Sequence, residues 1–294
     1  MKIGIYGQFY HEHSEAYIQL ILDALQHYDA EVLIKANFLK ILKANKGISD
    51  HVLSMGTFEE LDSSYDLFFS IGGDGTILRS VTYVRDLGIP IVGINSGRLG
   101  FLATIQKENV TESIQRILKG DYIISERALL SVSTEPAHPE LEPLNFALNE
   151  IAVNRKNTTS MIRVETHLNG EYLTTYWSDG LIVATPTGST GYSLSCGGPV
   201  IDPSTNSIVL TPIAPHNLNA RPFVIPDDCT VTLKVSGREE NYLMSLDSRI
   251  ATLDNETVIT IRKSPFSIKL VQLPDESFVK TLRKKLLWGE DKRN

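Results

Sequence analysis

Cysteine and long apolar runs are scarce in this 294-residue sequence. The two cysteines, Cys196 and Cys229, have no metal-ligating neighbours at the spacing of a zinc site. They form no disulfide framework and are typical of a reducing compartment. No apolar run approaches the ~20 residues that cross a bilayer, and the N-terminus begins as a strand pattern rather than as a signal peptide. We therefore expect a cytoplasmic protein with no membrane partner and no metal-ligating residue cluster.

Positive charge is scarce as well. The formal net charge is −7, and the only dense basic run is Arg283-Lys284-Lys285 near the C-terminus. Surfaces that bind nucleic acid depend on a basic patch or stripe. We therefore expect no nucleic-acid partner and interpret the short run as a solvated helix face. The length predicts about two domains.

Two common nucleotide-binding motifs are also missing. No G-x-x-x-x-G-K-[ST] segment is present, which excludes a P-loop enzyme. The glycines at the strand ends lack G-x-G-x-x-G spacing, and no acidic residue follows them at the usual distance of ~20 residues. A hydride-transferring Rossmann domain is therefore disfavoured.

The N-terminal part of the chain alternates between strand and helix patterns. We expect strands at residues 3–6, 31–34, 67–71 and 89–94, and helices at 14–28, 38–44 and 76–87. Such alternation predicts a mostly parallel sheet with helices on both faces. Ligands of sheets of this kind bind at the carboxyl ends of the strands.

The pattern becomes strand-rich after residue 121. We expect strands at residues 129–134, 161–168, 171–177, 181–185, 230–235, 258–262 and 267–273, and a helix at 277–287. Asn169-Gly170 predicts a type I′ hairpin turn. The chain should therefore form a Rossmann-like α/β domain over residues 1–120, completed by 275–294, and an all-β domain over 121–274.

The most informative motif is Gly72-Gly73-Asp74-Gly75, here called the glycine turn. It lies between a buried strand pattern and a helix pattern, where glycines let a ligand's phosphates approach the backbone. One carboxylate in that place fits phosphoryl transfer, in which it accepts or orients the proton of the attacking hydroxyl. Asp74 as a helix N-cap and Asp74 as a Mg²⁺ ligand are the alternatives.

Two polar residues, Asn149 and Glu150, interrupt an apolar strand-like run. If they are buried, they must find polar partners. An amide and a carboxylate suit an adenine edge and a ribose diol. The alternative is a β-bulge or an edge pair that faces solvent.

Residues 185–199 (TPTGSTGYSLSCGGP) form what we call the hydroxyl-rich segment. Its hydroxyls and glycines suit hydrogen bonding along a ligand, and Tyr192 could stack on a base. A flexible linker is the alternative, but the interspersed Pro186, Leu194 and Pro199 argue against it. Among other residues, Arg79 and Arg98 follow glycine-containing turns and could meet phosphate.

Taken together, these residues resemble the bacterial NAD kinase family over nearly the whole chain. The resemblance rests on residues 72–76, 93–95, 100–102, 149–150, 178–180, 185–199 and 215–222. A Gly-Gly-Asp-Gly turn also occurs in lipid kinases and, in a related form, in phosphofructokinases. The hydroxyl-rich segment together with Asn149 and Glu150 is more particular to NAD kinases.

The resemblance implies a reaction and a set of site residues. It implies transfer of a phosphoryl group from ATP to the 2′-hydroxyl of the adenosine ribose of NAD⁺, with a divalent cation such as Mg²⁺ and Asp74 as the general base. It also implies a homotetramer with shared sites. The implied nucleotide-binding residues are Gly75, Phe101, Asn149, Glu150, Asp179, Thr190, Gly191, Tyr192, Ser193, Leu194, Ser195 and Ala214. Arg79 joins them as a candidate nucleotide contact because of its place after the glycine turn.

Three residues depart from the pattern of that family. Gly191 and Cys196 stand where alanine is common, and Arg249 stands where many relatives have glutamine. The arginine puts in doubt any ligand contact carried over to position 249. Two other functions remain alternatives: a lipid kinase of the diacylglycerol type, and a non-catalytic module that senses NAD(P).

Overall fold

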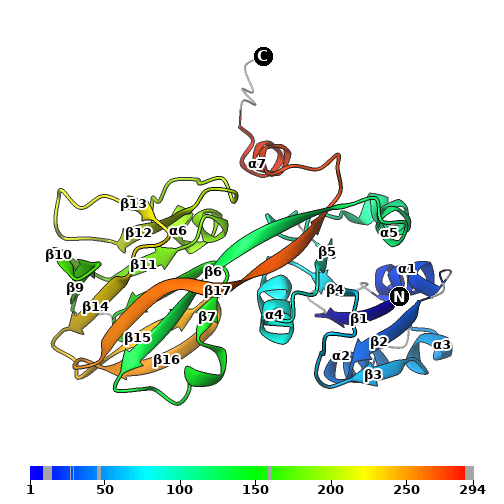
Figure 1. Cartoon of the computed structure of the whole chain (residues 1–294), viewed down its shortest axis with the longest axis horizontal. Helices are drawn as coiled ribbons and strands as arrows, with labels where there is room; N and C mark the ends of the chain where they lie inside the picture. The colour runs from blue at the N-terminus through cyan, green and yellow to red at the C-terminus, as the bar shows by residue number, and fades with distance from the viewer. Residues whose placement is uncertain are drawn as a thin grey trace. The chain divides into compact units, whose positions relative to one another are not determined.

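Two units make up the chain in the computed structural model, which describes residues 1–8, 15–26, 28, 30–44, 48–97, 99–157 and 160–288 (Figure 1). The first unit comprises Met1–Glu126 and Ile268–Asn294, and the second comprises Arg127–Ser267. Both boundaries fall within long strands, β6 (Ile123–Glu135) and β17 (Val258–Gln272).

A parallel sheet forms the centre of the first unit. Its order is β3-β2-β1-β4-β5, and β5 also pairs in parallel with Leu270 of β17. Every residue of β4 and β5 is buried, as expected for parallel strands that are covered on both faces. The bounds are β1 (Lys2–Gly7), β2 (Glu31–Lys35), β3 (Gly56–Phe58), β4 (Leu67–Gly72) and β5 (Ile91–Asn95).

Helices pack around this sheet. Helix α4 follows β4 and packs on it, α2 packs on β2, and α1 packs against α5. The last helix, α7, also belongs to the first unit, and its residue Phe278 packs with its ring 6.2 Å from that of Phe101. The bounds are α1 (Glu15–Gln26), α2 (Ala36–Lys43), α3 (Asp50–Leu53), α4 (Asp74–Val84), a 3₁₀ turn (Lys107–Asn109), α5 (Val110–Leu118) and α7 (Phe278–Leu286).

The second unit is built from antiparallel strands. One sheet has the order β13-β12-β11-β8-β15-β16, and the other strands follow the order β10-β9-β14-β17, with β6 pairing β17 and β7. The bounds are β7 (Phe146–Ala147), β8 (Glu150–Asn154), β9 (Ile162–Leu168), β10 (Glu171–Ser178), β11 (Gly180–Ala184), β12 (Ser207–Ile213), β13 (Phe223–Pro226), β14 (Val231–Ser236), β15 (Asn241–Leu246) and β16 (Arg249–Asp254). Short 3₁₀ turns lie at Glu142–Leu144 and Thr187–Thr190, and helix α6 spans Tyr192–Ser195.

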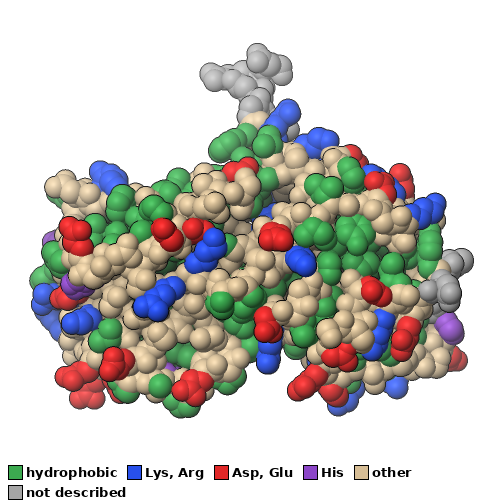
Figure 2. Space-filling model, in the orientation of Figure 1, with side chains coloured by type: hydrophobic (Ala, Val, Ile, Leu, Met, Phe, Trp, Pro, Cys, Tyr) green, Lys and Arg blue, Asp and Glu red, His purple; other side chains and the backbone are tan. Residues whose placement is uncertain are grey.

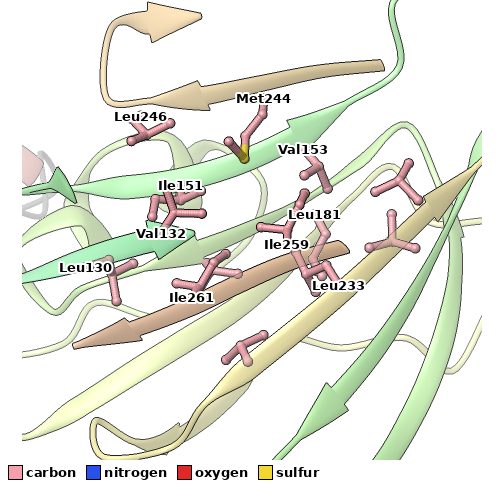
Figure 3. Packing of buried hydrophobic residues seen from close by; sticks show 14 of the residues in the cluster. Leu130, Val132, Ile151, Val153, Leu181, Leu233, Met244, Leu246, Ile259 and Ile261 are labelled. Atoms are coloured by element: carbon pink, nitrogen blue, oxygen red, sulfur yellow. The ribbon is translucent and has the colours of Figure 1, made fainter. Parts of the chain in front are cut away.

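A large apolar core lies between the strands of the second unit (Figure 3), and a smaller cluster includes Ile182 and Val209. Buried and more exposed residues alternate along β14 and β15, because successive side chains of a strand point to opposite faces. Strands of both orders contribute to the large core, among them Leu130, Val132, Ile151, Val153, Leu181, Leu233, Met244, Leu246, Ile259 and Ile261. This packing gives the strands beside Glu150 a rigid support.

The expected fold class is confirmed: an α/β domain with a mostly parallel sheet and an antiparallel β domain. Asn169 and Gly170 have φ angles of 51° and 85° in the turn between β9 and β10, as a type I′ hairpin requires. The expectation of separate strands at 258–262 and 267–273 was wrong, because β17 runs continuously through Pro265. Strands β12, β15 and β16 were not anticipated.

Charged side chains of both signs are interspersed on the face of the molecule in view (Figure 2). Within the described ranges, no helix has the length and apolar character that a membrane crossing needs.

Candidate functional site

The glycine turn joins β4 directly to α4. Gly73 occupies the N-cap position with extended backbone, and Asp74 is the first residue of the helix. The N-cap residue is thus a glycine with no side-chain capping bond, and the bonds of the Asp74 carboxylate go to residues 101–103. The interpretation of Asp74 as an N-cap was therefore wrong, and its carboxylate is directed elsewhere.

The Asp74 carboxylate accepts hydrogen bonds from three successive backbone N–H groups. Oδ2 accepts from Phe101 at 2.8 Å, and Oδ1 accepts from Leu102 at 3.0 Å and from Ala103 at 3.1 Å. Bonds from several N–H groups orient a carboxylate strongly. Asp74 thus ties the start of α4 to the segment that follows β5.

Glycines on either side of this carboxylate meet different surroundings. A Cβ on Gly100 would lie 1.9 Å from Oδ1 of Asp74, so only glycine lets this backbone come so close. A Cβ on Gly73 or Gly75, in contrast, would meet nothing within 4 Å. The turn therefore leaves open space beside its own backbone while its carboxylate is held from the other side.

Phe101 and Arg79, two further residues of the expected site, also lie in the first unit. The Phe101 ring has Lys285 Nζ 5.2 Å from its centroid, and that ammonium donates to the Leu99 carbonyl at 2.7 Å. Arg79 is exposed on α4 and hydrogen-bonds the Tyr6 hydroxyl. Burial raises the pKa of Tyr6 to about 12. Arg98, the other arginine considered, lies outside the described residues.

In the second unit, Asn149 and Glu150 lie at the start of the central strand β8, which pairs with both β11 and β15. The Glu150 residue is 8% exposed. Glu150 Oε2 and Asn149 Oδ1 are buried and have no hydrogen-bond partner within the described part of the chain. The alternative of a bulge or solvent-facing edge pair was therefore wrong. Buried polar atoms without partners are rare and costly, so these two oxygens are candidate ligand contacts.

Burial dominates the electrostatics of Glu150. Burial and, to a smaller extent, the neighbouring charge of Asp247 raise the pKa of this carboxyl to about 8, whereas a hydrogen bond from the Tyr192 N–H opposes the shift. Burial likewise raises the pKa of Asp247, against the effect of three backbone N–H donors. The carboxyl of Glu150 thus holds its proton to a higher pH than an exposed glutamate does.

This shift has a consequence for stability. Folded Glu150 releases its proton with a pKa of about 8, whereas the unfolded chain releases it near the ordinary glutamate pKa of 4.5. The folded state therefore binds more protons between these values, and its stability falls as pH rises through them, by at most roughly 1.4 kcal/mol per pH unit. We expect Glu150→Gln to gain thermal stability relative to the wild type from pH 5.5 to 8 and to level off above pH 8.

Thermal unfolding of the unliganded proteins at several pH values measures this difference. The matched control is Glu239→Gln, because Glu239 is exposed on the same unit, and its difference from the wild type should stay flat. A flat difference for Glu150→Gln as well would contradict a buried, protonated Glu150.

Asp247 in the turn between β15 and β16 contacts the same segment. Its carboxylate accepts from the N–H groups of Leu148 at 2.9 Å, Asn149 at 2.8 Å and Glu150 at 3.2 Å. Its own N–H donates to the Glu150 carbonyl at 3.0 Å, and its φ is 51°. Sequence analysis assigned no role to this position. An acidic residue in a two-residue turn after an apolar strand was the available signal.

Arg249 contacts protein backbone. Its guanidinium donates to the carbonyls of Leu144 and Phe146 and lies 5.4 Å from the centroid of the Phe146 ring. The arginine at this position therefore holds the backbone of the segment that leads into β8.

The hydroxyl-rich segment packs on the same residues. The Thr185 hydroxyl donates to the Leu148 carbonyl at 2.6 Å and accepts from the Gly188 N–H at 3.0 Å. A Cβ on Gly188 would lie 2.0 Å from the Asn149 carbonyl oxygen. These contacts are those of an ordered segment, so the flexible-linker alternative was wrong.

The expected ligand contacts within this segment fall into two groups. Ser193 is buried and bonds the Thr211 hydroxyl at 2.8 Å, and the Thr190 hydroxyl donates to the Thr187 carbonyl at 3.2 Å. Tyr192 is 40% exposed. Leu194 is half-buried and Ser195 is exposed, whereas Gly191 lies beside Glu150, with 3.2 Å from a Cβ position to Oε2. Tyr192 and Ser195 are thus the accessible side chains.

Asp179 and Ala214 lie at one end of the β11–β12 pair. The Asp179 carboxylate forms an ion pair with Arg155 at 2.9 Å, and its N–H donates to the Ile213 carbonyl at 2.9 Å. Ala214 follows β12 with a φ of 43° and is exposed.

Solved structures define the class of protein. Yeast NADH kinase, crystallised with NADH, shares the fold with a TM-score of 0.83 at 21% identity, over 99% of this chain and 88% of the yeast chain. An NAD kinase from Archaeoglobus fulgidus, crystallised with ATP, has a TM-score of 0.74 at 27% identity, over 97% of each chain. The two-domain architecture is therefore that of kinases of nicotinamide dinucleotides.

The sequence comparisons define the family. The family model of the ATP-NAD kinase N-terminal domain matches residues 19–122, and that of the C-terminal domain matches residues 148–273. NAD kinases from Christiangramia forsetii and Flavobacterium psychrophilum are 59% and 56% identical to this chain, over the full length of each protein. The chain belongs to the ATP-NAD kinase family, as the resemblance implied. This membership counts against the lipid-kinase and sensing-module alternatives.

Proposed function

We propose that this protein transfers the γ-phosphoryl group of ATP to the 2′-hydroxyl of the adenosine ribose of NAD⁺, giving ADP and NADP⁺. The observation that carries the proposal is the match to both ATP-NAD kinase domains, which include the glycine turn and the pair Asn149 and Glu150. The relatives at 59% and 56% identity are NAD kinases over their whole length.

In this proposal the first unit supplies the catalytic base. The 2′-hydroxyl oxygen forms a bond to the γ-phosphorus, the bond from that phosphorus to the β–γ bridging oxygen breaks, and the hydroxyl proton passes to Asp74. The fixed position of the carboxylate and the open space beside Gly73 and Gly75 support this assignment. Arg79 is a candidate contact for phosphate, and Phe101 lines the same site.

The second unit supplies the dinucleotide contacts in the proposal. Asn149 holds adenine and Glu150 holds the ribose diol, which would satisfy two buried oxygens that now lack partners. Asp179 contacts the adenine end or a ligand of a neighbouring subunit. The remaining proposed contacts are Thr190, Gly191, Tyr192, Ser193, Leu194, Ser195 and Ala214, with the buried Ser193 acting through its backbone.

Mg²⁺ would arrive with ATP as part of the substrate. Among the described residues, no three His, Cys, Asp or Glu side chains gather as a candidate metal site. Mg²⁺ in phosphoryl-transfer enzymes is commonly held by substrate phosphates and water with one or two carboxylates. Asp74 is the acidic side chain at the glycine turn that suits such a contact.

We further propose a cytoplasmic homotetramer, as the family resemblance implies. Light scattering on the purified protein tests the assembly, and a monomeric mass would contradict it.

The reaction itself is tested with purified protein, Mg-ATP and NAD⁺, coupling any NADP⁺ to an NADP⁺-specific dehydrogenase. Steady formation of NADPH that depends on ATP is the expected result. Absence of NADP⁺ from protein that is folded and binds NAD⁺ would contradict the proposed donor, and inorganic polyphosphate would then be tested in its place.

A further inference from the structure

The backbone N–H groups of Leu148, Asn149 and Glu150 all donate to one side chain from a distant part of the chain. Pairing between β8 and β15 extends from Leu243–Asn154 to Leu246–Ile151, so it ends just after Glu150. The N–H groups of the residues before that point need other acceptors. Asp247 supplies them, because its two carboxylate oxygens accept from residues 148, 149 and 150.

The turn of Asp247, Ser248 and Arg249 also holds this segment through donors. The Asp247 N–H bonds the Glu150 carbonyl, and the Arg249 guanidinium bonds the carbonyls of Leu144 and Phe146. The turn therefore both accepts hydrogen bonds from N–H groups within residues 144–150 and donates hydrogen bonds to carbonyls of the same segment. Asp247 itself has a positive φ, so its side-chain direction depends on this turn conformation.

The same carboxylate affects the charge of Glu150. Its negative charge is one of the causes that keep the proton on Glu150, and the Tyr192 N–H acts against them. Arg249 is the cation that faces Asp247, and Asp179 is a further acid near Tyr192. Asp247 thus affects both the position and the protonation of Glu150.

We propose that Asp247 is a positioning residue for the dinucleotide: it sets the backbone of Asn149 and Glu150, which carry the proposed contacts with adenine and the ribose diol. This inference rests on the proposed function for the ligand, but the contacts of Asp247 are independent of it. In the first unit Asp74 accepts from three successive N–H groups in the same way, next to the open space of the glycine turn. Asp247 instead acts through its neighbours.

The decisive variant is Asp247→Asn, whose amide keeps one acceptor oxygen and turns an NH₂ group toward backbone donors. Bonds to a charged acceptor are strong enough that we expect KM for NAD⁺ to rise ~10- to 100-fold. KM for ATP and kcat should change less than about threefold. Loss of the Asp247 charge should also lower the pKa of Glu150. The rise of NAD⁺ affinity that accompanies deprotonation of Glu150 should therefore occur at a lower pH than in the wild type. Ser248→Ala, in the same turn, is the matched control and should leave all of these values unchanged.

Several results would overturn the proposal. An unchanged KM for NAD⁺, an equal loss for both substrates, or an unshifted pH profile would each reduce Asp247 to a stabilising residue. If Asp247→Asn does not fold, Arg249→Gln is tested instead, because it removes the bonds to Leu144 and Phe146. KM for NAD⁺ should then rise severalfold while KM for ATP stays unchanged. An unchanged KM for NAD⁺ would contradict the proposal. Calorimetric titration with NAD⁺ needs no turnover. It therefore separates failure of this inference from failure of the proposed reaction.

Discussion

Asp74→Asn is expected to lower kcat by ~10²- to 10⁴-fold, which is the usual contribution of a general base. The side chain stays nearly the same size, but it can no longer take the proton of the attacking hydroxyl. Coupled measurement of NADP⁺ formation at saturating ATP and NAD⁺ determines the loss. Asp86→Asn is the matched control, because Asp86 is an exposed acid just beyond α4. Turnover close to that of the wild type would contradict the base assignment.

The contacts of Asp74 require a second measurement beside the rate. The same carboxylate holds the N–H groups of Phe101, Leu102 and Ala103, so a loss of activity alone does not separate a base from an anchor. Hydrogen exchange at these three amides does so. A base role predicts lost turnover with NAD⁺ binding retained and little change in exchange. Faster exchange at residues 101–103 together with weaker substrate binding would assign the loss to the anchor.

Gly188→Ala is expected to damage the second unit. The added Cβ would lie 2.0 Å from the Asn149 carbonyl oxygen and 2.4 Å from its carbonyl carbon. Both are backbone atoms, so either Asn149 or the 3₁₀ turn must move. Overpacking of this kind costs ~1–3 kcal/mol. We expect a lower melting temperature and a rise of ~10-fold or more in KM for NAD⁺, because a 1 Å shift at a binding residue has effects of that size or larger.

Cys196→Ala is the matched control in the same segment. Cys196 is half-buried and is not one of the proposed contacts, and the change removes one sulfur atom without adding any atom near Asn149. The melting temperature and KM for NAD⁺ should therefore stay near the wild-type values. Thermal unfolding and initial rates of both variants make the comparison. Equal behaviour of the two variants would contradict the close packing of Gly188 on Asn149.

Several features of the site were predictable because their causes are local. The glycine turn was recognisable from a buried apolar strand, three glycines and a helix pattern that are consecutive in the sequence. The hairpin at Asn169 and Gly170 follows from the positive φ angles that those two residue types tolerate. The series of strand-like segments in the second half predicted the all-β domain, because strand patterns are also local.

Other features were not predictable, since they depend on residues far apart in the chain. Asp247 bonds the Asn149 N–H across 98 positions, and Asp74 bonds the Phe101 N–H across 27. Neither pairing has a local pattern. The continuity of β17 through Pro265 was missed as well, because proline normally marks the end of a strand or its edge.

By itself, the sequence determined the fold class, the family resemblance and the residue types that we propose as nucleotide contacts, because glycine, carboxylate and hydroxyl positions follow from short-range steric and chemical requirements. Only the tertiary structure decided which of these groups already have hydrogen-bond partners within the protein. It showed that Ser193 is bonded in the interior, that Glu150 Oε2 is buried without a partner, and that Asp247 supports the segment before β8. Burial and hydrogen-bond partners arise only when distant strands pair, and they set the charge and position of each site residue.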